Sequence, residues 1–313
     1  MSFLPLVNLT SLGVTISLIV IGGGLAWLAF RAWSAREVDR RVIFAFMLVA
    51  VSAPILFPVT FKESATPIVR AVFEKVESLP AGSKVLISYD FDPAMAPEVQ
   101  PQAEVFIRHC LAKGHKVVFM SLWATGQSLL SGSIEKIVKR EFLEKVEGTD
   151  YAVLGYKAGN EGVLNVIVTD LKKMFPTDVS SHPLSGIPIF NGIESCKDFD
   201  LILTIGGGKP GAKEWILFVG DPANVPIGAG LAAVSAPQLY PYYPKQLLGL
   251  LGGIKGAAEY ESELAARYER FRTTETPGLR MMGPQTLAHL VIIAFIVLGN
   301  VAFFRGRALE GKK

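Results

Sequence analysis

The sequence predicts an α/β domain with a mostly parallel, three-layer sheet, anchored in a membrane by three helices. Three observations support this fold class. Long apolar runs occupy Leu9–Trp33, Val42–Phe61 and Thr286–Phe304. Between the second and third runs, short strand patterns alternate with amphipathic helix patterns. Half of the 313 residues are hydrophobic and only 19% are charged, below the roughly 25% of soluble domains, so part of the chain is expected in lipid.

The first run predicts an uncleaved membrane anchor. Its core, Leu12–Phe30, has no charge for about 19 residues, enough to cross a hydrocarbon layer of ~30 Å. No Lys or Arg precedes this core, whereas a signal peptide begins with a basic region. The mid-helix glycines Gly22–Gly24 either admit a neighbouring helix or leave a thinly packed span. In the second run, Pro54 should kink or end the helix. We interpret His289, in the third run, as an interfacial or helix-packing residue rather than a proton relay.

Basic residues predict the orientation of the chain. The short segment Arg31–Arg41 carries four arginines against two acids, and basic residues also follow the third run, from Arg305 to Lys313. The positive-inside rule places both segments in the cytoplasm, and the N-terminus and the intervening domain outside it. In a bacterium with two membranes, this predicts the inner membrane, with the domain in the periplasm. The opposite orientation is the alternative. The expected parts are residues 1–63 (two membrane helices), 64–280 (the α/β domain) and 281–313 (the third helix and a basic tail).

The central segment predicts a Rossmann-like fold. Apolar strands that alternate with helices of ten to fifteen residues indicate right-handed crossovers and a parallel sheet covered on both faces. Ligands of such sheets bind beyond the carboxyl ends of the strands, where the strand order reverses. The predicted strands are Lys84–Asp90, Lys116–Leu122, Tyr151–Gly155, Leu201–Ile205 and Ile227–Ser235. The predicted helices are Ser64–Leu79, Glu98–Lys113, Ser133–Val146, Glu161–Met174, Gly211–Val219, most of Pro237–Arg272 and a short helix over Gly192–Cys196. Ser133 is the expected N-cap of the third helix. A loop is expected over Pro176–Pro188 and a linker over Glu275–Gly278.

Asp90 and Asp92 are the sharpest catalytic candidates, because they follow the first strand as Asp-Phe-Asp. Aspartates at this spacing resemble those of the haloacid-dehalogenase phosphatases, in which the first is the nucleophile and the second the acid/base. The resemblance implies phosphate binding by Ser121 and metal binding by Asp221. Pro93 and the lack of a second acid beyond Asp221 depart from that family. The alternative is that Asp90 and Asp92 cap the following turn and helix.

A glycine-rich loop follows the fourth predicted strand. Its residues Gly206, Gly207, Gly208, Lys209 and Gly211 are candidate ligand-binding residues, because glycines before a helix let backbone N–H groups approach an anion. The spacing does not match the GxxxxGK[ST] phosphate loop, since Pro210 follows the lysine. A tight strand-to-helix turn is therefore the alternative.

The sequence gives little support for serine catalysis, metal binding, nucleic-acid binding or a disulfide. Ser235 lacks the Gly-x-Ser-x-Gly context of hydrolase serines, and no histidine has an acid or cysteine at metal-ligand spacing. We expect no metal and no cofactor. The net charge of +3 is not clustered, so nucleic acid is not an expected partner. Cys110 and Cys196 either pair outside the cytoplasm or are two buried small hydrophobic residues, and we favour the second interpretation.

The stretch Pro237–Lys255 provides the interface candidates. Tyrosines are common at protein and membrane interfaces, and small residues let another element approach closely. The alternative is packing within the domain. The candidates are Tyr240, Tyr242, Tyr243, Gly249, Gly252, Gly253 and Gly256.

Three segments resemble an uncharacterised family of bacterial membrane proteins that carry a domain of unknown function. They read KVLISYDFDPAMAPEVQP, HPLSGIPIFNGI and VSAPQLYPYYPKQLLGLLGGIKGAAEYE. The resemblance implies a membrane-tethered α/β domain and assigns no activity and no catalytic residue. The lack of a complete catalytic constellation in the sequence, together with the tyrosines and glycines of Pro237–Lys255, predicts a non-enzymatic subunit or scaffold of a membrane complex. Its expected partners are the lipid bilayer and other subunits or further copies of itself. The alternative is an extracytoplasmic ligand-binding domain or phosphate-ester hydrolase.

Overall fold

The computed structural model describes residues 12–34, 39–56, 60–61, 63–272 and 276–310. The chain forms two compact units. One unit combines residues 1–62 with 279–313, and the other comprises residues 63–278.

The first unit is built from helices α1 (Leu12–Trp33), α2 (Arg40–Leu56) and most of α12 (Pro277–Glu310). Its core is small and brings the three helices together. Gly24 of α1 faces the ring of Phe46 in α2, so a side chain at that position would overlap the ring. Phe46 also contacts Phe295 of α12, with ring centroids 5.8 Å apart. Gly22 and Gly23, by contrast, face open space. The buried residues of this core are Ile21, Ala50, Leu287 and Val291.

Among the described residues, one helical segment is long and apolar enough to cross a membrane, Pro277–Ala308. It begins nine residues before the predicted start at Thr286, because the expected linker residues Pro277 and Gly278 are already helical. The second helix begins at Arg40 rather than Val42, and Pro54 lies inside it two residues before its end. Parts of the predicted runs, basic segments and linker fall outside the described part of the chain, namely residues 9–11, 35–38, 57–59, 275 and 311–313.

The second unit contains a sheet of six parallel strands in the order β3-β2-β1-β4-β5-β6. This is the strand order of the dinucleotide-binding Rossmann fold, so the predicted α/β class is confirmed. The strands are β1 (Lys84–Asp90), β2 (Lys116–Ser121), β3 (Tyr151–Tyr156), β4 (Leu201–Gly206), β5 (Ile227–Leu231) and β6 (Gly249–Gly252).

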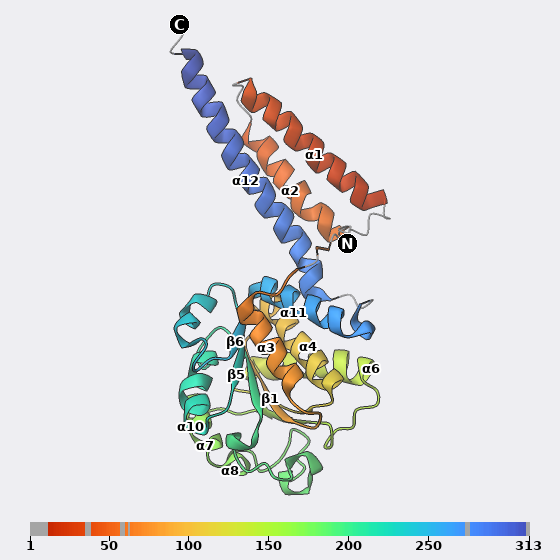
Figure 1. The fold of residues 1–313 in the computed structure, drawn as a ribbon, viewed down its shortest axis with the longest axis vertical. Coiled ribbons are helices and arrows are strands. Elements are labelled where there is room, and N and C mark those ends of the chain that lie inside the picture. The colour runs from red at the N-terminus through yellow and green to blue at the C-terminus, as the bar shows by residue number, and fades with distance from the viewer. Residues whose placement is uncertain (1–11, 35–38, 57–59, 62, 273–275, 311–313) are drawn as a thin grey trace. The chain divides into compact units, whose positions relative to one another are not determined.

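Helices cover both faces of this sheet (Figure 1). On one face, α4 (Ala96–Lys113) lies beside α3 (Pro67–Ser78), α5 (Ala124–Ser133) and α11 (Gly253–Arg267). On the other face lie α7 (Glu161–Ile167), α8 (Leu171–Met174), α9 (Ala212–Trp215) and α10 (Asp221–Ala223). Each face has its own apolar core, because the strands are buried on both sides.

The third predicted helix of the domain was placed too late in the chain. The helical segment runs from Ala124 through a π-helical turn at Ile134–Val138 and ends at Glu141, instead of spanning Ser133–Val146. Ser133 is buried within the segment rather than at its N-cap, and its Oγ accepts a hydrogen bond from Gln100 Nε2. Gly126 faces the carbonyl oxygen of Tyr89, so a glycine lets the helix start directly beside β1.

The stretch Pro237–Arg272, expected to be largely helical, is helical over most of its length but contains a strand that was not predicted. Short 3₁₀ turns, strand β6 and then α11 occupy this stretch. Leu250 packs into one apolar core and Leu251 into the other, which is the alternation of a strand buried on both faces. Pairing with β5 therefore outweighs the apparent helical pattern.

Smaller differences concern element ends. Strand β5 ends at Leu231 rather than Ser235. The predicted helix Glu161–Met174 is interrupted, and Asp170 caps its second part by accepting a hydrogen bond from the Lys173 N–H. The short helix expected at Gly192–Cys196 is a 3₁₀ turn at Cys196–Asp198.

Candidate functional site

The strand order places the candidate site at the carboxyl ends of β1 and β4. The chain leaves β1 toward β2 and β3, and then returns to the other side of β1 to form β4. Ligands of doubly wound sheets bind at such a reversal point. Asp90 ends β1 and pairs in register with Gly206, which ends β4, so two of the predicted candidates lie side by side.

Asp90 is fully buried and accepts four hydrogen bonds. Its Oδ1 accepts from the Leu122 N–H and from Ser88 Oγ, each at 2.8 Å. Its Oδ2 accepts from Trp215 Nε1 at 2.8 Å and from Thr204 Oγ1 at 3.3 Å. Burial raises the pKa of Asp90 to about 6, although these hydrogen bonds oppose the rise. The carboxylate therefore joins β1, β2, β4 and α9, and all four of its partners are donors.

Asp92 and Ser121 also bond to the protein itself. Asp92 Oδ1 accepts from the Met95 N–H at 3.1 Å, which caps the turn before α4 as the alternative interpretation expected. Ser121 is buried, and its hydroxyl lies within hydrogen-bonding distance of the carbonyl oxygens of Tyr89 and Trp123. In this arrangement the Ser121 hydroxyl does not face solvent.

Side chains of the domain lie close to two glycines of the loop, although Gly208 itself is exposed. The ring of Trp123 lies against Gly208, and Trp123 Nε1 donates to the Pro210 carbonyl at 2.8 Å. The Met95 side chain lies against Gly207, and Ser235 Oγ donates to the Gly207 carbonyl at 3.3 Å. A side chain at Gly207 or Gly208 would overlap these groups, so close packing is one reason for glycine at both positions.

The Glu214 carboxylate accepts the backbone hydrogen bond that a bound anion would accept at the start of α9. Glu214 Oε2 accepts from the Gly211 N–H at 3.0 Å, directly before α9. The one cation of the loop, Lys209, points to solvent and forms an ion pair with Glu161 at 3.0 Å. Since Asp90, Asp92 and Glu214 add negative charge here, a phosphate group would meet unfavourable electrostatics.

Asp221 lies near the amino end of β5, whereas Asp90 lies at the carboxyl end of β1. It precedes β5, and its Oδ2 accepts from Gln246 Nε2 at 2.6 Å. The two residues line a cavity of about 260 Å³ beside Ile227, the first residue of β5. The structure therefore does not bring Asp221 together with Asp90, as the phosphatase resemblance requires.

Comparison with protein-family models, curated proteins and solved structures found no match for this chain.

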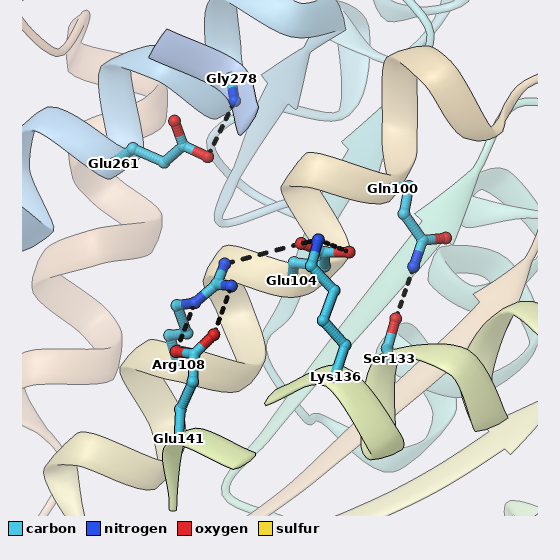
Figure 2. Close-up of polar contacts among 8 residues, drawn as sticks. All are labelled: Gln100, Glu104, Arg108, Ser133, Lys136, Glu141, Glu261 and Gly278. Carbon is cyan, nitrogen blue, oxygen red and sulfur yellow. Dashed lines mark hydrogen bonds and ion pairs between the residues drawn. The ribbon is translucent and has the colours of Figure 1, made fainter. Parts of the chain in front are cut away.

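A charge cluster around the buried residues Glu104 and Arg108 of α4 was not predicted from the sequence. Arg108 binds Glu141 through two hydrogen bonds, at 2.9 and 2.7 Å, and lies 3.7 Å from Glu104. Lys136 donates to both oxygens of Glu104, at 2.9 and 2.7 Å. Figure 2 shows Arg108 between the two glutamates. The one sequence signal was the i,i+4 spacing of Glu104 and Arg108, which usually indicates an exposed helix face.

A second polar cluster joins α3, α4 and α11. Tyr260 O–H donates to His109 Nδ1 at 2.6 Å, and His109 Nε2–H donates to Glu77 at 2.9 Å. Burial lowers the pKa of His109 to about 4. Burial would raise the pKa of Glu77, but hydrogen bonds from Tyr268 and His109 outweigh it and lower that pKa to about 2. Apart from the exposed Lys136, these groups are buried or partly buried, so we interpret both clusters as structural.

The predicted interface residues separate into two groups. The glycines face neighbours within the domain: Gly249 the Ile68 carbonyl, Gly252 the side chain of Ala236, Gly253 that of Ala233, and Gly256 the residue Leu251. Tyr240 is exposed, whereas Tyr242 and Tyr243 are half-buried. Val234, which precedes the 3₁₀ turns, is 84% exposed, and Tyr240 is 53% exposed.

The two cysteines cannot pair, because they lie on opposite faces of the sheet. Cys110 belongs to the core on the α4 side, and Cys196 to the core on the α7 side. Both are free and buried. Within the described residues, no group of three or more His, Cys, Asp or Glu side chains is arranged to hold a metal ion.

Proposed function

We propose that the chain is a non-enzymatic, membrane-anchored subunit or scaffold of a bacterial membrane protein complex. In this proposal, α1, α2 and α12 all cross the inner membrane. The segment Arg31–Arg41 and the C-terminus lie in the cytoplasm, and the α/β domain lies outside it. The partners are the lipid bilayer and other subunits or further copies of the chain.

The packing at the carboxyl ends of β1 and β4 carries this proposal. Rossmann domains that bind nucleotides keep this position open and place glycines after β1. Here the residues after β1 are Phe91-Asp92-Pro93-Ala94-Met95. Asp90, Trp123 and Glu214 occupy the position with hydrogen bonds to the protein itself. Groups of the domain thus take hydrogen bonds that a bound nucleotide would need, which supports a role in assembly.

The exposed side chains of Val234 and Tyr240 are the contact surface that we propose for another subunit. Both follow β5 in the connection to β6. Apolar and aromatic side chains that stand in solvent release free energy when a partner covers them, and tyrosine is enriched at such contacts.

Native mass spectrometry of the full chain, extracted from its own membranes in mild detergent, tests the proposal. We expect an assembly several times heavier than the 33.9 kDa chain, with a fixed composition. Val234→Ser combined with Tyr240→Ala should reduce the share of this assembly. Leu143→Ser, which changes another exposed apolar residue, is the matched control. A wild-type chain that is only monomeric would contradict the proposal.

A phosphate-ester hydrolase or ligand-binding domain is the second candidate, favoured by the raised pKa of Asp90 at a strand end. Asp92→Asn tests it best, because an Asn Oδ1 can keep the hydrogen bond from the Met95 N–H. The hydrolase requires that the wild-type chain hydrolyse p-nitrophenyl phosphate and that Asp92→Asn abolish this activity without unfolding. Equal rates in both chains, or no hydrolysis by either, would count against it.

A further inference from the structure

We propose that α12 carries a self-association surface, and that the α12 helix of a second copy of this chain occupies it. The proposal rests on the membrane-anchored function proposed above and names one partner for it. The surface, called the outer seam, consists of His289, Ile293, Ile296, Asn300 and Phe303.

The outer seam has the spacing of a helix-packing surface. Successive members are four, three, four and three residues apart, which is the a/d pattern of a heptad repeat. A repeat of 3.5 residues keeps one face of a helix against a partner that coils around it. The pattern lies within Pro277–Ala308, the segment that is long and apolar enough to cross a membrane.

The outer seam faces away from the core that α12 shares with α1 and α2. Val291 is buried in that core. Asn300 follows it by nine residues, which is about two and a half turns at ~3.6 residues per turn, so it lies on the opposite side of α12. The apolar members Ile293, Ile296 and Phe303 are 57%, 59% and 58% exposed. Within the part of the chain that the structure describes, the seam is therefore left uncovered.

Asn300 gives this face a chemical requirement that lipid cannot meet. Its Nδ2 donates to the Ile296 carbonyl at 2.8 Å. The other N–H and Oδ1 have no hydrogen-bond partner among the described residues. Lipid tails offer neither donor nor acceptor, and an unsatisfied amide in hydrocarbon is costly. A helix that covers the seam must therefore bring both a donor and an acceptor to this depth.

A second copy meets this requirement. Because every copy has the same orientation in the membrane, two α12 helices run parallel, and a two-fold axis between them brings each seam residue against itself. The carboxamide is self-complementary, since each Asn300 can donate an N–H to the Oδ1 of the other. An asparagine at an a position also fixes the register and the number of helices, as it does in coiled coils.

Cysteine cross-linking of the full chain in its own membranes tests the proposal. Ile296→Cys places a thiol in the seam, and Val301→Cys places one at nearly the same depth but outside it. The parent chain is a control, because Cys110 and Cys196 are buried. With copper phenanthroline as oxidant, we expect a dimer with Ile296→Cys and none with Val301→Cys. Adding Asn300→Ala to Ile296→Cys should weaken association by about 3-fold to 10-fold.

Each outcome decides between the hypotheses. A dimer formed equally at both positions would indicate random collision and overturn the proposal. So would the absence of any adduct, which indicates lipid alone, or a cross-link to a different protein. Alkaline carbonate washing is done in parallel: if the wash releases the chain, the membrane-anchored function itself fails, whereas a retained chain without the Ile296→Cys dimer refutes only the seam.

Discussion

Asp90 illustrates how burial changes the role of a residue that looks catalytic. A strand-end aspartate suggested a nucleophile, but the side chain is sealed from solvent and held by donors from three strands or their ends and one helix. Its partner Trp215 is 125 residues away in the sequence. A local motif cannot reveal such a contact, because only the packing of α9 against the sheet creates it.

The Asp90→Asn variant should be less stable than wild type by about 1–3 kcal/mol at pH 7. The Leu122 N–H and Trp215 Nε1–H face different oxygens of the carboxylate. The Asn Nδ2 must therefore face one of these donors and leave it unsatisfied. Urea unfolding of the full chain in mild detergent, followed by tryptophan fluorescence, measures the difference. Equal stability of the two chains would contradict the prediction.

The same pair of chains should show a definite pH dependence. The folded protein holds the Asp90 proton up to a pKa of about 6, against an ordinary value of 3.8. Between these values the folded state binds more protons than the unfolded state, so the contribution of Asp90 to stability is lost as pH rises. The stability of wild type relative to Asp90→Asn should therefore fall from pH 4 to pH 7. A difference that grows over this range would refute the pKa assignment.

At the scale of elements, contacts with neighbouring segments decide whether Gly249 lies in a strand or in a helix. Gly249 was expected in a helix, yet it begins the edge strand β6, where α3 crosses it. The sequence GLLGG contains no alternation that reveals a strand, since a strand buried on both faces reads as a continuous apolar run. The position of α4 was predicted well by its apolar stripe. The burial of Glu104 and Arg108 on α4 was not predicted, because it depends on neighbouring helices that cover α4 on both sides.

Two glycine substitutions should have opposite effects. Gly249→Ala places a methyl group against the Ile68 carbonyl, which is backbone and cannot turn away, and should cost about 1–3 kcal/mol. Gly162→Ala lies on the exposed side of α7 with no atom within 4 Å of the added carbon, and should stabilise by about 0.5–1 kcal/mol. The same urea unfolding experiment measures both, and effects of the same sign would contradict this account.

At the scale of the whole molecule, the sheet separates the two cysteines. Strands buried on both faces leave Cys110 and Cys196 in different apolar cores. Burial raises the pKa of both thiols well above the usual range, so neither forms a reactive thiolate.

Alkylation should report this separation. Iodoacetamide should leave both cysteines of the native chain unmodified and modify both after denaturation, with no dependence on prior reduction. Mass spectrometry of the intact chain counts the adducts. A thiol that appears only after reduction would indicate a disulfide and contradict the placement.

The sequence alone determined the α/β class, the first four strands to within one residue, and the apolar helix at the C-terminal end. These features follow from periodicity and from long runs of apolar residues, which act locally. Only the tertiary structure decided that β6 is a strand, that Asp221 lies far from Asp90, and that Trp123 and Glu214 hydrogen-bond to the glycine loop. Each of these depends on contacts between distant segments, whose free energies outweigh the local preferences of the residues involved.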